Sequence, residues 1–180
     1  MSAKIVECPR DAMQGLKEFI PTDVKISYLN SLLNCNFHTL DFGSFVSPKA
    51  IPQLADTAEV LEGLHMTNTK LLAIVANMRG AEVAIHYNEI TYLGFPFSIS
   101  ETFQHRNTNT AQSDAFDLVK QMQELCTKYN KTLVVYISMG FGNPYGDAWN
   151  VDIVADWTNK MQALGITIIS LADTVGAAQP

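Results

Sequence analysis

The chain has 180 residues, of which 47% are hydrophobic, and this is enough for a sizeable core and excludes a disordered chain. Its 12 basic and 18 acidic residues give a formal net charge of −6, which argues against nucleic acid or an anionic membrane as the main partner. We therefore expect a globular enzyme or binding domain with no nucleic-acid partner and no membrane partner.

The amino terminus, "MSAKIVECPR", lacks the apolar core of a signal peptide. No apolar run approaches the roughly 18 to 20 residues that a membrane-spanning helix needs. These features predict a cytoplasmic protein. The cysteines, Cys8, Cys35 and Cys126, are widely spaced and form no CxxC pair, so they indicate neither a disulfide framework nor a zinc knuckle. We expect them to be buried thiols.

Short β-rich apolar runs alternate six times with longer segments of helical spacing. The runs predicted to be strands are 4–8, 38–42, 71–76, 90–99, 132–137 and 166–171. They recur on average about every 30 residues, the length of a βαβ unit. The clearest helical patterns lie at 111–129 and 151–164, and Gly165 follows the second as a helix-ending glycine. This alternation predicts an α/β fold with parallel strands covered by helices.

Six consecutive βα units fit either a doubly wound open sheet or most of a (β/α)8 barrel, which usually takes about 250 residues. Chain length favours the open sheet. The strand ends favour the barrel, because nearly every strand is followed by polar or ionisable residues that a barrel would gather on one face. The glycine-rich dinucleotide fingerprint is also missing after the first strand. The polar or ionisable residues at or just past the ends of the predicted strands are Arg10, Asp11, Asp41, Ser44, Asn77, Ser100, Glu101, Tyr136, Ser138, Asp173 and Thr174.

Arg10 and Asp11 follow the first predicted strand directly. On an extended or turn backbone their side chains would point apart and serve one site from two sides. A carboxylate suits Mg²⁺ or Mn²⁺, and a guanidinium suits a developing oxyanion. A surface ion pair or a helix cap is the alternative. Asp41 lies in an otherwise apolar strand, so it is either functional or paired with a hydroxyl or a helix dipole.

Two loops have the composition of ligand-contacting segments. "SFVSPKAIP" contains two serines and two prolines and predicts a shaped loop after the second strand. "YISMGFGNPYG" contains three glycines and a proline, which predicts a flexible or tightly turned segment that could close on a substrate.

Five segments together resemble the hydroxymethylglutaryl-CoA lyases, which belong to a metal-dependent, pyruvate carboxyltransferase-type superfamily of (β/α)8 barrels. They are "VECPRDAMQG", "FGSFVSPKAIPQL", "SETFQHRNTN", "YISMGFGNPYG" and "ISLADTVG". They span the chain in the family's order. The resemblance implies a single partial TIM-barrel catalytic domain over residues 1–180, with about six of the eight βα units. It also implies retro-aldol cleavage of an acyl-CoA substrate, 3-hydroxy-3-methylglutaryl-CoA, to acetyl-CoA and acetoacetate with bound Mg²⁺ or Mn²⁺.

The resemblance also assigns catalytic roles. It implies that Asp11 is a metal ligand and that Arg10 stabilises the enolate oxygen of the departing acetyl-CoA. Asp41 stands where the family usually has a glutamate, and its side chain is one methylene shorter. Tyr136 and Asp173 match polar residues of the family's active-site face and are expected to be catalytic.

Four further residues are expected to bind the substrate. Ser44 matches a family position that contacts the acyl-CoA. Asn77, Ser138 and Thr174 are the other three, and each lies at or just past the end of a predicted strand.

The family's His-x-His metal pair and its cysteine-bearing loop have no counterpart up to Pro180. We therefore expect a truncated chain whose activity is open and whose unpaired edge strands favour a homodimer. One alternative is a non-catalytic fragment that binds acyl-CoA or self-associates. Another is a synthase of the same superfamily that condenses acetyl-CoA with a 2-oxo acid.

Overall fold

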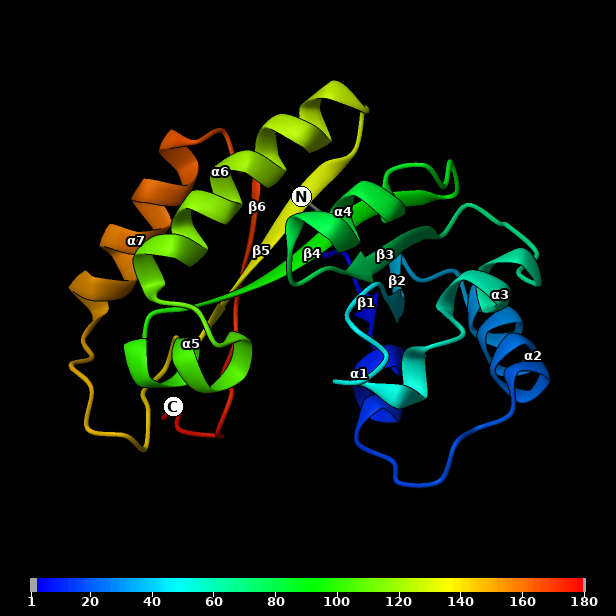
Figure 1. Cartoon of the computed structure of the whole chain (residues 1–180), viewed down its shortest axis with the longest axis horizontal. Coiled ribbons are helices and arrows are strands. Elements are labelled where there is room, and N and C mark those ends of the chain that lie inside the picture. Colours follow the sequence, from blue (N-terminus) through cyan, green and yellow to red (C-terminus); the bar gives the residue numbers. More distant parts are fainter. Residues whose placement is uncertain (1–2, 180) are drawn as a thin grey trace. The chain divides into compact units, whose positions relative to one another are not determined.

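A computed structural model describes residues 3–179 of the chain (Figure 1). Within these residues six strands alternate with helices, and they are hydrogen-bonded in chain order, β1 to β6. The pairs β1–β2, β2–β3 and β5–β6 are parallel. The predicted α/β class built from βα units is therefore confirmed. None of the helices in this part of the chain has the length and apolar character to cross a membrane.

The chain divides into two compact units, one up to Leu93 and one from Gly94. The first unit holds the short strand β1 and two longer strands, together with four α-helices and a 3₁₀ turn. Its elements are β1 (Val6–Glu7), α1 (Pro9–Gln14), α2 (Thr22–Leu33), β2 (Thr39–Ser44), η1 (Pro52–Leu54), α3 (Thr57–Glu62), β3 (Lys70–Ile74) and α4 (Met78–Ala84). The strand β4 (Ile90–Ser98) begins in this unit and ends in the second.

The core of the first unit forms where helix α2 packs against β2 and α3. The buried residues of α2 are Lys25, Leu29 and Leu33, which lie four apart and therefore share one face of the helix. Lys25 is only 2% exposed, and its ammonium group pairs with Asp56 at 2.8 Å. A charged residue thus occupies one position of an otherwise apolar stripe.

The second unit contains the end of β4 and the elements α5 (Glu101–Thr108), α6 (Gln112–Lys128), β5 (Thr132–Ser138), α7 (Val151–Ala163) and β6 (Ile168–Leu171). Figure 1 shows α6 and α7 lying along β5 and β6. The ring of Trp157 on α7 lies 4.7 Å from Phe97 of β4 and 5.6 Å from Phe116 of α6. This aromatic cluster joins both helices to the sheet.

The predicted elements differ from the observed ones mainly at their ends. The first strand is only two residues long, and the sixth begins at Ile168 rather than at residue 166. The helix predicted at 111–129 is one residue shorter at both ends, and the one predicted at 151–164 is one residue shorter only at its carboxyl end. Gly165 has a positive φ of 84° beyond the second helix. Tertiary contacts, which a pattern does not contain, decide where each element stops.

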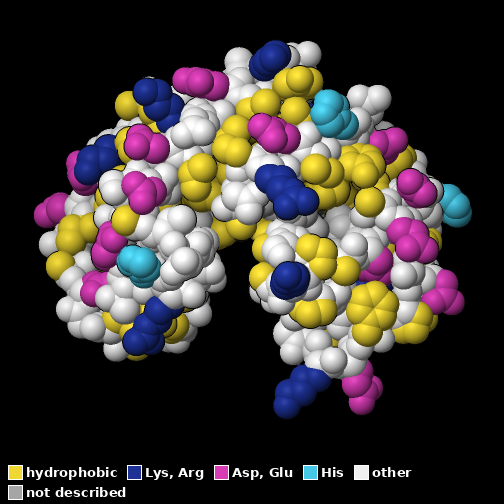
Figure 2. Space-filling model, in the orientation of Figure 1, with side chains coloured by type: hydrophobic (Ala, Val, Ile, Leu, Met, Phe, Trp, Pro, Cys, Tyr) yellow, Lys and Arg dark blue, Asp and Glu magenta, His cyan; other side chains and the backbone are white. Residues whose placement is uncertain are grey.

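The expectation of three buried thiols is wrong for two of them. Cys8 and Cys35 are exposed, and only Cys126 is buried. Burial raises the pKa of the Cys126 thiol to about 11, so this group stays protonated at neutral pH. On the face that Figure 2 shows, basic and acidic side chains lie interspersed over the surface.

Candidate active site

Helix α1 follows β1 almost directly and carries the first two predicted site residues. Pro9 occupies the start of this helix, where its fixed φ is favourable and its missing N–H costs nothing. Arg10 and Asp11 are therefore helical, and the expected extended or turn backbone is wrong. Their side chains do not point apart, because Nη1 of Arg10 donates to Oδ1 of Asp11 at 3.0 Å.

The guanidinium of Arg10 binds the carboxylate of Asp41 on β2. Nε donates to both carboxylate oxygens at 3.1 Å, and Nη2 donates to Oδ2 at 2.6 Å. Asp41 is 1% exposed and Arg10 is 9% exposed. Nη1 of Arg10 also donates to Oε1 of Gln14, one helical turn later, at 2.8 Å. Such a clamp of charge-assisted hydrogen bonds holds the planar guanidinium in one orientation.

Two opposing effects act on the pKa of Asp41 in the Arg10–Asp41 pair. Burial raises the pKa of the Asp41 carboxyl above its ordinary value, and the hydrogen bonds and charge of Arg10 act in the opposite direction. Arg10 therefore favours the ionised form of this carboxyl group and opposes the effect of burial. The partner of Asp41 is neither the hydroxyl nor the helix dipole considered from the sequence.

Asp11 lies at the exposed end of the same cluster, with 65% of its side chain accessible. Its Oδ1 accepts hydrogen bonds from Arg10 and from Nε2 of Gln14, the latter at 3.2 Å. Residues 3–179 contain no group of three His, Cys, Asp or Glu side chains arranged to hold a metal ion. A hard divalent cation takes about six oxygen ligands. The described residues alone therefore do not form a complete divalent-metal site.

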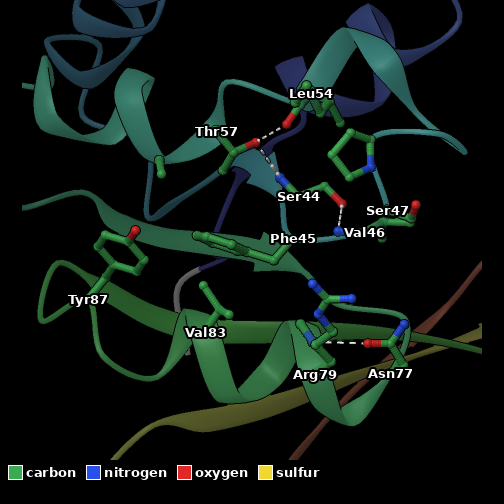
Figure 3. A pocket seen from close by; sticks show the side chains of 14 residues that line it. Ser44, Phe45, Val46, Ser47, Leu54, Thr57, Asn77, Arg79, Val83 and Tyr87 are labelled. Atoms are coloured by element: carbon green, nitrogen blue, oxygen red, sulfur yellow. Dashed lines mark hydrogen bonds between the residues drawn. The ribbon is translucent and has the colours of Figure 1, made fainter.

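Ser44 and Asn77 lie at the carboxyl ends of β2 and β3 and line one cavity of about 300 Å³ (Figure 3). The Ser44 hydroxyl donates to the carbonyl of Ile74 at 3.3 Å and accepts from the N–H of Val46 at 3.2 Å. The side chain of Asn77 caps α4 by accepting from the N–H of Gly80 at 2.9 Å. The substrate-binding roles of Ser44 and Asn77 stay predictions.

In the second unit, Ser138 and Thr174 meet around Met139 at the end of β5. The hydroxyl oxygen of Thr174 accepts from the N–H of Met139 at 2.8 Å, and the carbonyl of Ser138 accepts from the N–H of Ile99 at 3.3 Å. Met139 is fully buried and has a φ of 60°, a conformation that a residue other than glycine rarely adopts. Backbone strain of this kind clusters at functional sites.

The last two predicted catalytic residues belong to the same pair of strands. Tyr136 is half-buried and pairs in register with Ser170 of β6. The carboxylate of Asp173, just past β6, accepts hydrogen bonds from the N–H groups of Ala177 at 2.7 Å and Ala178 at 3.2 Å. The structure thus brings Arg10, Asp11 and Asp41 together by hydrogen bonds and places Ser44 and Asn77 at one cavity. The other four predicted residues, Tyr136, Ser138, Asp173 and Thr174, lie at or just past the ends of β5 and β6.

The glycine-containing loop after β5 is held in place by hydrogen bonds, both within the loop and to the start of α5. Asp147 accepts hydrogen bonds from the hydroxyl of Ser100 at 2.5 Å and from the N–H of Thr102 at 3.0 Å, at the start of α5. Asn143 accepts from the N–H groups of Tyr145 and Asp147 at 3.0 and 3.1 Å, which closes the turn. These hydrogen bonds hold the pKa of Asp147 below its usual range, with that from Ser100 contributing most.

Two residues of these networks were missed from the sequence. Gln14 holds Arg10 from four positions later, a spacing that signals contact only on a helix, and no helix was expected there. Asp147 contacts α5 across more than forty positions of the chain, and no local pattern reveals such a pairing.

The sequence matches the family model described as HMGL-like over residues 4–180. It is 33% identical over 98% of its length to the cytoplasmic 3-hydroxy-3-methylglutaryl-CoA lyase of Rattus norvegicus, covering 52% of that protein. It is 34% identical over 96% of its length to the hydroxymethylglutaryl-CoA lyase YngG of Bacillus subtilis, covering 58% of it. The chain thus spans about half the length of the curated relatives it matches.

Solved structures give the same result. An HMG-CoA lyase from Bacillus subtilis superposes with a TM-score of 0.93 and 34% identity, covering 98% of this chain and 60% of that one. An HMG-CoA lyase from Acinetobacter baumannii, in complex with coenzyme A and 3-methylmalate, superposes with a TM-score of 0.92 and 30% identity, covering 100% and 61%. The predicted resemblance and the predicted partial TIM-barrel fold are both confirmed.

Proposed function

Because the chain belongs to the HMGL-like family, we propose that it has the chemistry of a hydroxymethylglutaryl-CoA lyase. This chemistry is the retro-aldol cleavage of 3-hydroxy-3-methylglutaryl-CoA to acetyl-CoA and acetoacetate. The observation that carries the proposal is the buried clamp between Arg10, which follows the carboxyl end of β1, and Asp41, in the middle of the neighbouring strand β2. Since the chain covers only part of each relative, the reaction and its substrate are proposals for this chain.

Arg10 is the group we assign to the developing charge. When the carbon–carbon bond breaks, the departing acetyl-CoA carries negative charge on its enolate oxygen, and a fixed guanidinium stabilises that oxygen without reorganising. Asp41 and Gln14 supply the fixation, from two sides of the guanidinium. Asp41 thus acts through Arg10 as a positioning residue, which suits a side chain one methylene shorter than the family's usual glutamate.

The metal and the substrate complete the proposal. A divalent cation, when bound, would polarise the substrate's oxygens, and Asp11 would supply one carboxylate toward it. The acyl-CoA would be contacted by Ser44, Asn77, Ser138 and Thr174, with Tyr136 and Asp173 moving protons. A solved relative in complex with coenzyme A supports the substrate class.

We also propose a cytoplasmic location, although the names of relatives include both cytoplasmic and mitochondrial forms.

The test is an assay for acetoacetate release from 3-hydroxy-3-methylglutaryl-CoA, run alongside calorimetric titration of the purified chain with Mn²⁺. Saturable Mn²⁺ binding together with product, both reduced in Asp11→Asn, would support the lyase. Mn²⁺ binding and product formation that are both unchanged in Asp11→Asn would refute the role of Asp11. Absence of product in the presence of saturating Mn²⁺ would refute the activity for this chain.

A second candidate function is non-catalytic binding of acyl-CoA, or self-association. The lack of a complete metal donor set among the described residues favours it. Titration with acetyl-CoA, in the absence of any metal, separates the two functions. Tight metal-independent binding without turnover would support the binding protein.

A further inference from the structure

A buried glutamine, Gln53, holds the segment that connects α1 to α2. It belongs to the turn η1, after the loop that follows β2, and is 4% exposed. Its Oε1 accepts a hydrogen bond from the N–H of Ile20 at 2.9 Å. Its Nε2 donates to the carbonyl of Glu18 at 2.8 Å and reaches that of Leu16 at 3.5 Å. One amide group thus contacts three backbone groups of the connecting segment.

The main chain of Gln53 is held as well. Its carbonyl accepts a hydrogen bond from the ammonium group of Lys25, which also pairs with Asp56 at 2.8 Å. Lys25 lies on α2 and is 2% exposed. A buried polar network whose members are all paired is rigid. Gln53 therefore forms a fixed connection between α2 and the segment 16–20.

Helix α1 depends on contacts with other elements. It has only six residues, and an isolated helix of that length is not stable in water. It contacts two elements, β2 and η1, and Figure 1 shows it beside the latter. The segment 16–20 that follows contains no helix or strand, and only Ile20 in it is not fully exposed. The turn that carries Gln53 is therefore one of the two main supports of α1.

The orientation of α1 decides whether Arg10 reaches its partners. The guanidinium of Arg10 binds Asp41 on β2 through hydrogen bonds of 2.6 to 3.1 Å, and it donates to Gln14 at 2.8 Å. Hydrogen bonds weaken steeply as their distance and angle change. The segment that Gln53 holds begins two residues after Gln14, the last residue of α1. A displacement of this segment would therefore also displace the helix that carries Arg10.

We propose that Gln53 is a positioning residue, which keeps α1 in the orientation that holds Arg10 against Asp41. It is buried and does not line the cavity of Ser44 and Asn77, so it acts through α1 and not by contact with a ligand there. The consequence for turnover rests on the proposed lyase function, in which Arg10 acts on the developing charge.

The experiment measures by NMR how fast the Nε–H proton of Arg10 exchanges with solvent in the whole chain. This proton is shared with both carboxylate oxygens of Asp41, so it exchanges when that contact opens. Gln53→Met keeps the length of the side chain and removes its hydrogen bonds. We expect exchange at least about tenfold faster, because each lost hydrogen bond contributes to holding α1 in place.

A second variant carries the same test if Gln53→Met does not fold. Gln53→Glu keeps the acceptor for the N–H of Ile20 and loses the donor to the carbonyl of Glu18. Exchange at Arg10 should therefore again be faster than in the wild type. Unchanged exchange in the folded variants of Gln53 would overturn the proposal.

Gln104→Met is the matched control. Gln104 is 1% exposed in the second unit, where it accepts from the N–H of Ser98 at 2.7 Å and donates to the hydroxyl of Thr108 at 2.6 Å. Because Gln104 and Gln53 share no partner, Gln104→Met should leave exchange at Arg10 within about twofold of the wild type. An equal acceleration in Gln104→Met would assign the effect to general loosening and overturn the proposal.

Steady-state kinetics give a second readout. In a chain that releases acetoacetate, Gln53→Met should lower kcat by about tenfold and leave KM within about twofold, because Arg10 acts on charge that develops only in the transition state. A raised KM with an unchanged kcat would overturn the positioning role. Absence of product from the wild type would refute the lyase alone, since the NMR measurement requires no turnover.

Discussion

The first unit contains two buried ion pairs, each between a basic and an acidic side chain. They differ in whether the pair also contacts an exposed side chain. Lys25 and Asp56 form a closed pair, in which the ammonium group also donates to the carbonyl of Gln53 and lies 4.0 Å from the ring centre of Phe19. Thr22 donates to Asp56 at 2.8 Å, so that both charges are surrounded by protein. This pair joins α2 to the segment before α3, with only 2% of the Lys25 side chain and 9% of the Asp56 side chain accessible.

The Arg10–Asp41 pair is open at one end. Its carboxylate is as deeply buried as any polar group of the chain, yet its guanidinium also binds Asp11, whose side chain is 65% exposed. The pair therefore leads from the interior to the surface. The difference shows that a buried ion pair is a candidate for catalysis only when one partner can still reach a ligand.

The largest expected effect comes from breaking the closed pair. Asp56→Asn leaves the Lys25 charge buried without a counter-ion, and we expect the free energy of unfolding to fall by about 3 kcal/mol. Urea denaturation measures it. Asp156→Asn is the matched control, because the Lys160–Asp156 pair is exposed and its loss should cost no more than about 0.5 kcal/mol. Equal costs for the two variants would contradict the structural role given to Lys25.

The second prediction breaks the open pair. Arg10→Gln should abolish acetoacetate release while leaving Mn²⁺ binding nearly intact, because Arg10 acts on the developing charge and not on the metal. The expected stability loss at neutral pH is about 2 kcal/mol, less than for Asp56→Asn, since Asp41 can take up a proton and become neutral. An active Arg10→Gln chain would refute the role of Arg10.

The free energy of unfolding of Arg10→Gln should also depend on pH in a predictable direction. Without Arg10 the pKa of Asp41 rises further, so the native state binds more protons than the unfolded state above the ordinary pKa of 3.8. The unfolding free energy of Arg10→Gln should therefore fall more steeply than that of the wild type as pH rises from acidic to neutral. Adding Asp41→Asn should remove the extra slope, and a slope that persists in the double variant would assign it to another group.

The third prediction concerns Asp147, a carboxylate whose pKa is lowered, whereas that of Asp41 is raised. The hydrogen bonds from Ser100 and Thr102 lower the pKa of Asp147, so its contribution to stability is present above the ordinary pKa of 3.8 and is lost as pH falls through its lower native value. Thermal unfolding of Asp147→Asn should therefore be less sensitive to acidification than that of the wild type. The same acid sensitivity in both proteins would contradict the assignment.

The smallest expected effect is at the exposed end of the open pair. Asp11→Asn should change the free energy of unfolding by no more than about 0.5 kcal/mol, because the side chain is largely accessible. It should nevertheless weaken Mn²⁺ binding in calorimetry. A large stability loss with unaltered Mn²⁺ binding would make Asp11 a structural partner of Arg10 and not a metal ligand.

The sequence predicts β3 and β5 well because each is a short apolar run that is mostly buried on both faces, whereas the more exposed β1 and β6 are shorter than predicted. The resemblance named Arg10, Asp11 and Asp41, but the sequence did not reveal that Asp41 binds Arg10 across 31 positions. Helix α1 was not predicted, because an extended or turn backbone was expected for Arg10 and Asp11 after the strand at 4–8, whereas Pro9 begins a helix there. Contacts between distant segments, such as Lys25 with Asp56, leave no local periodicity to detect.

The contact between Asp147 and the start of α5 has a dynamic consequence. Any opening of the loop after β5 must break the hydrogen bonds from Ser100 and Thr102, so the loop and the first turn of α5 open together. The amide hydrogens of residues 100–103, 143 and 145–147 should then exchange with solvent at correlated rates. A molecule that binds to either segment would also slow the amide exchange of the other segment. Exchange rates at the start of α5 would therefore report whether a ligand is bound to the loop after β5.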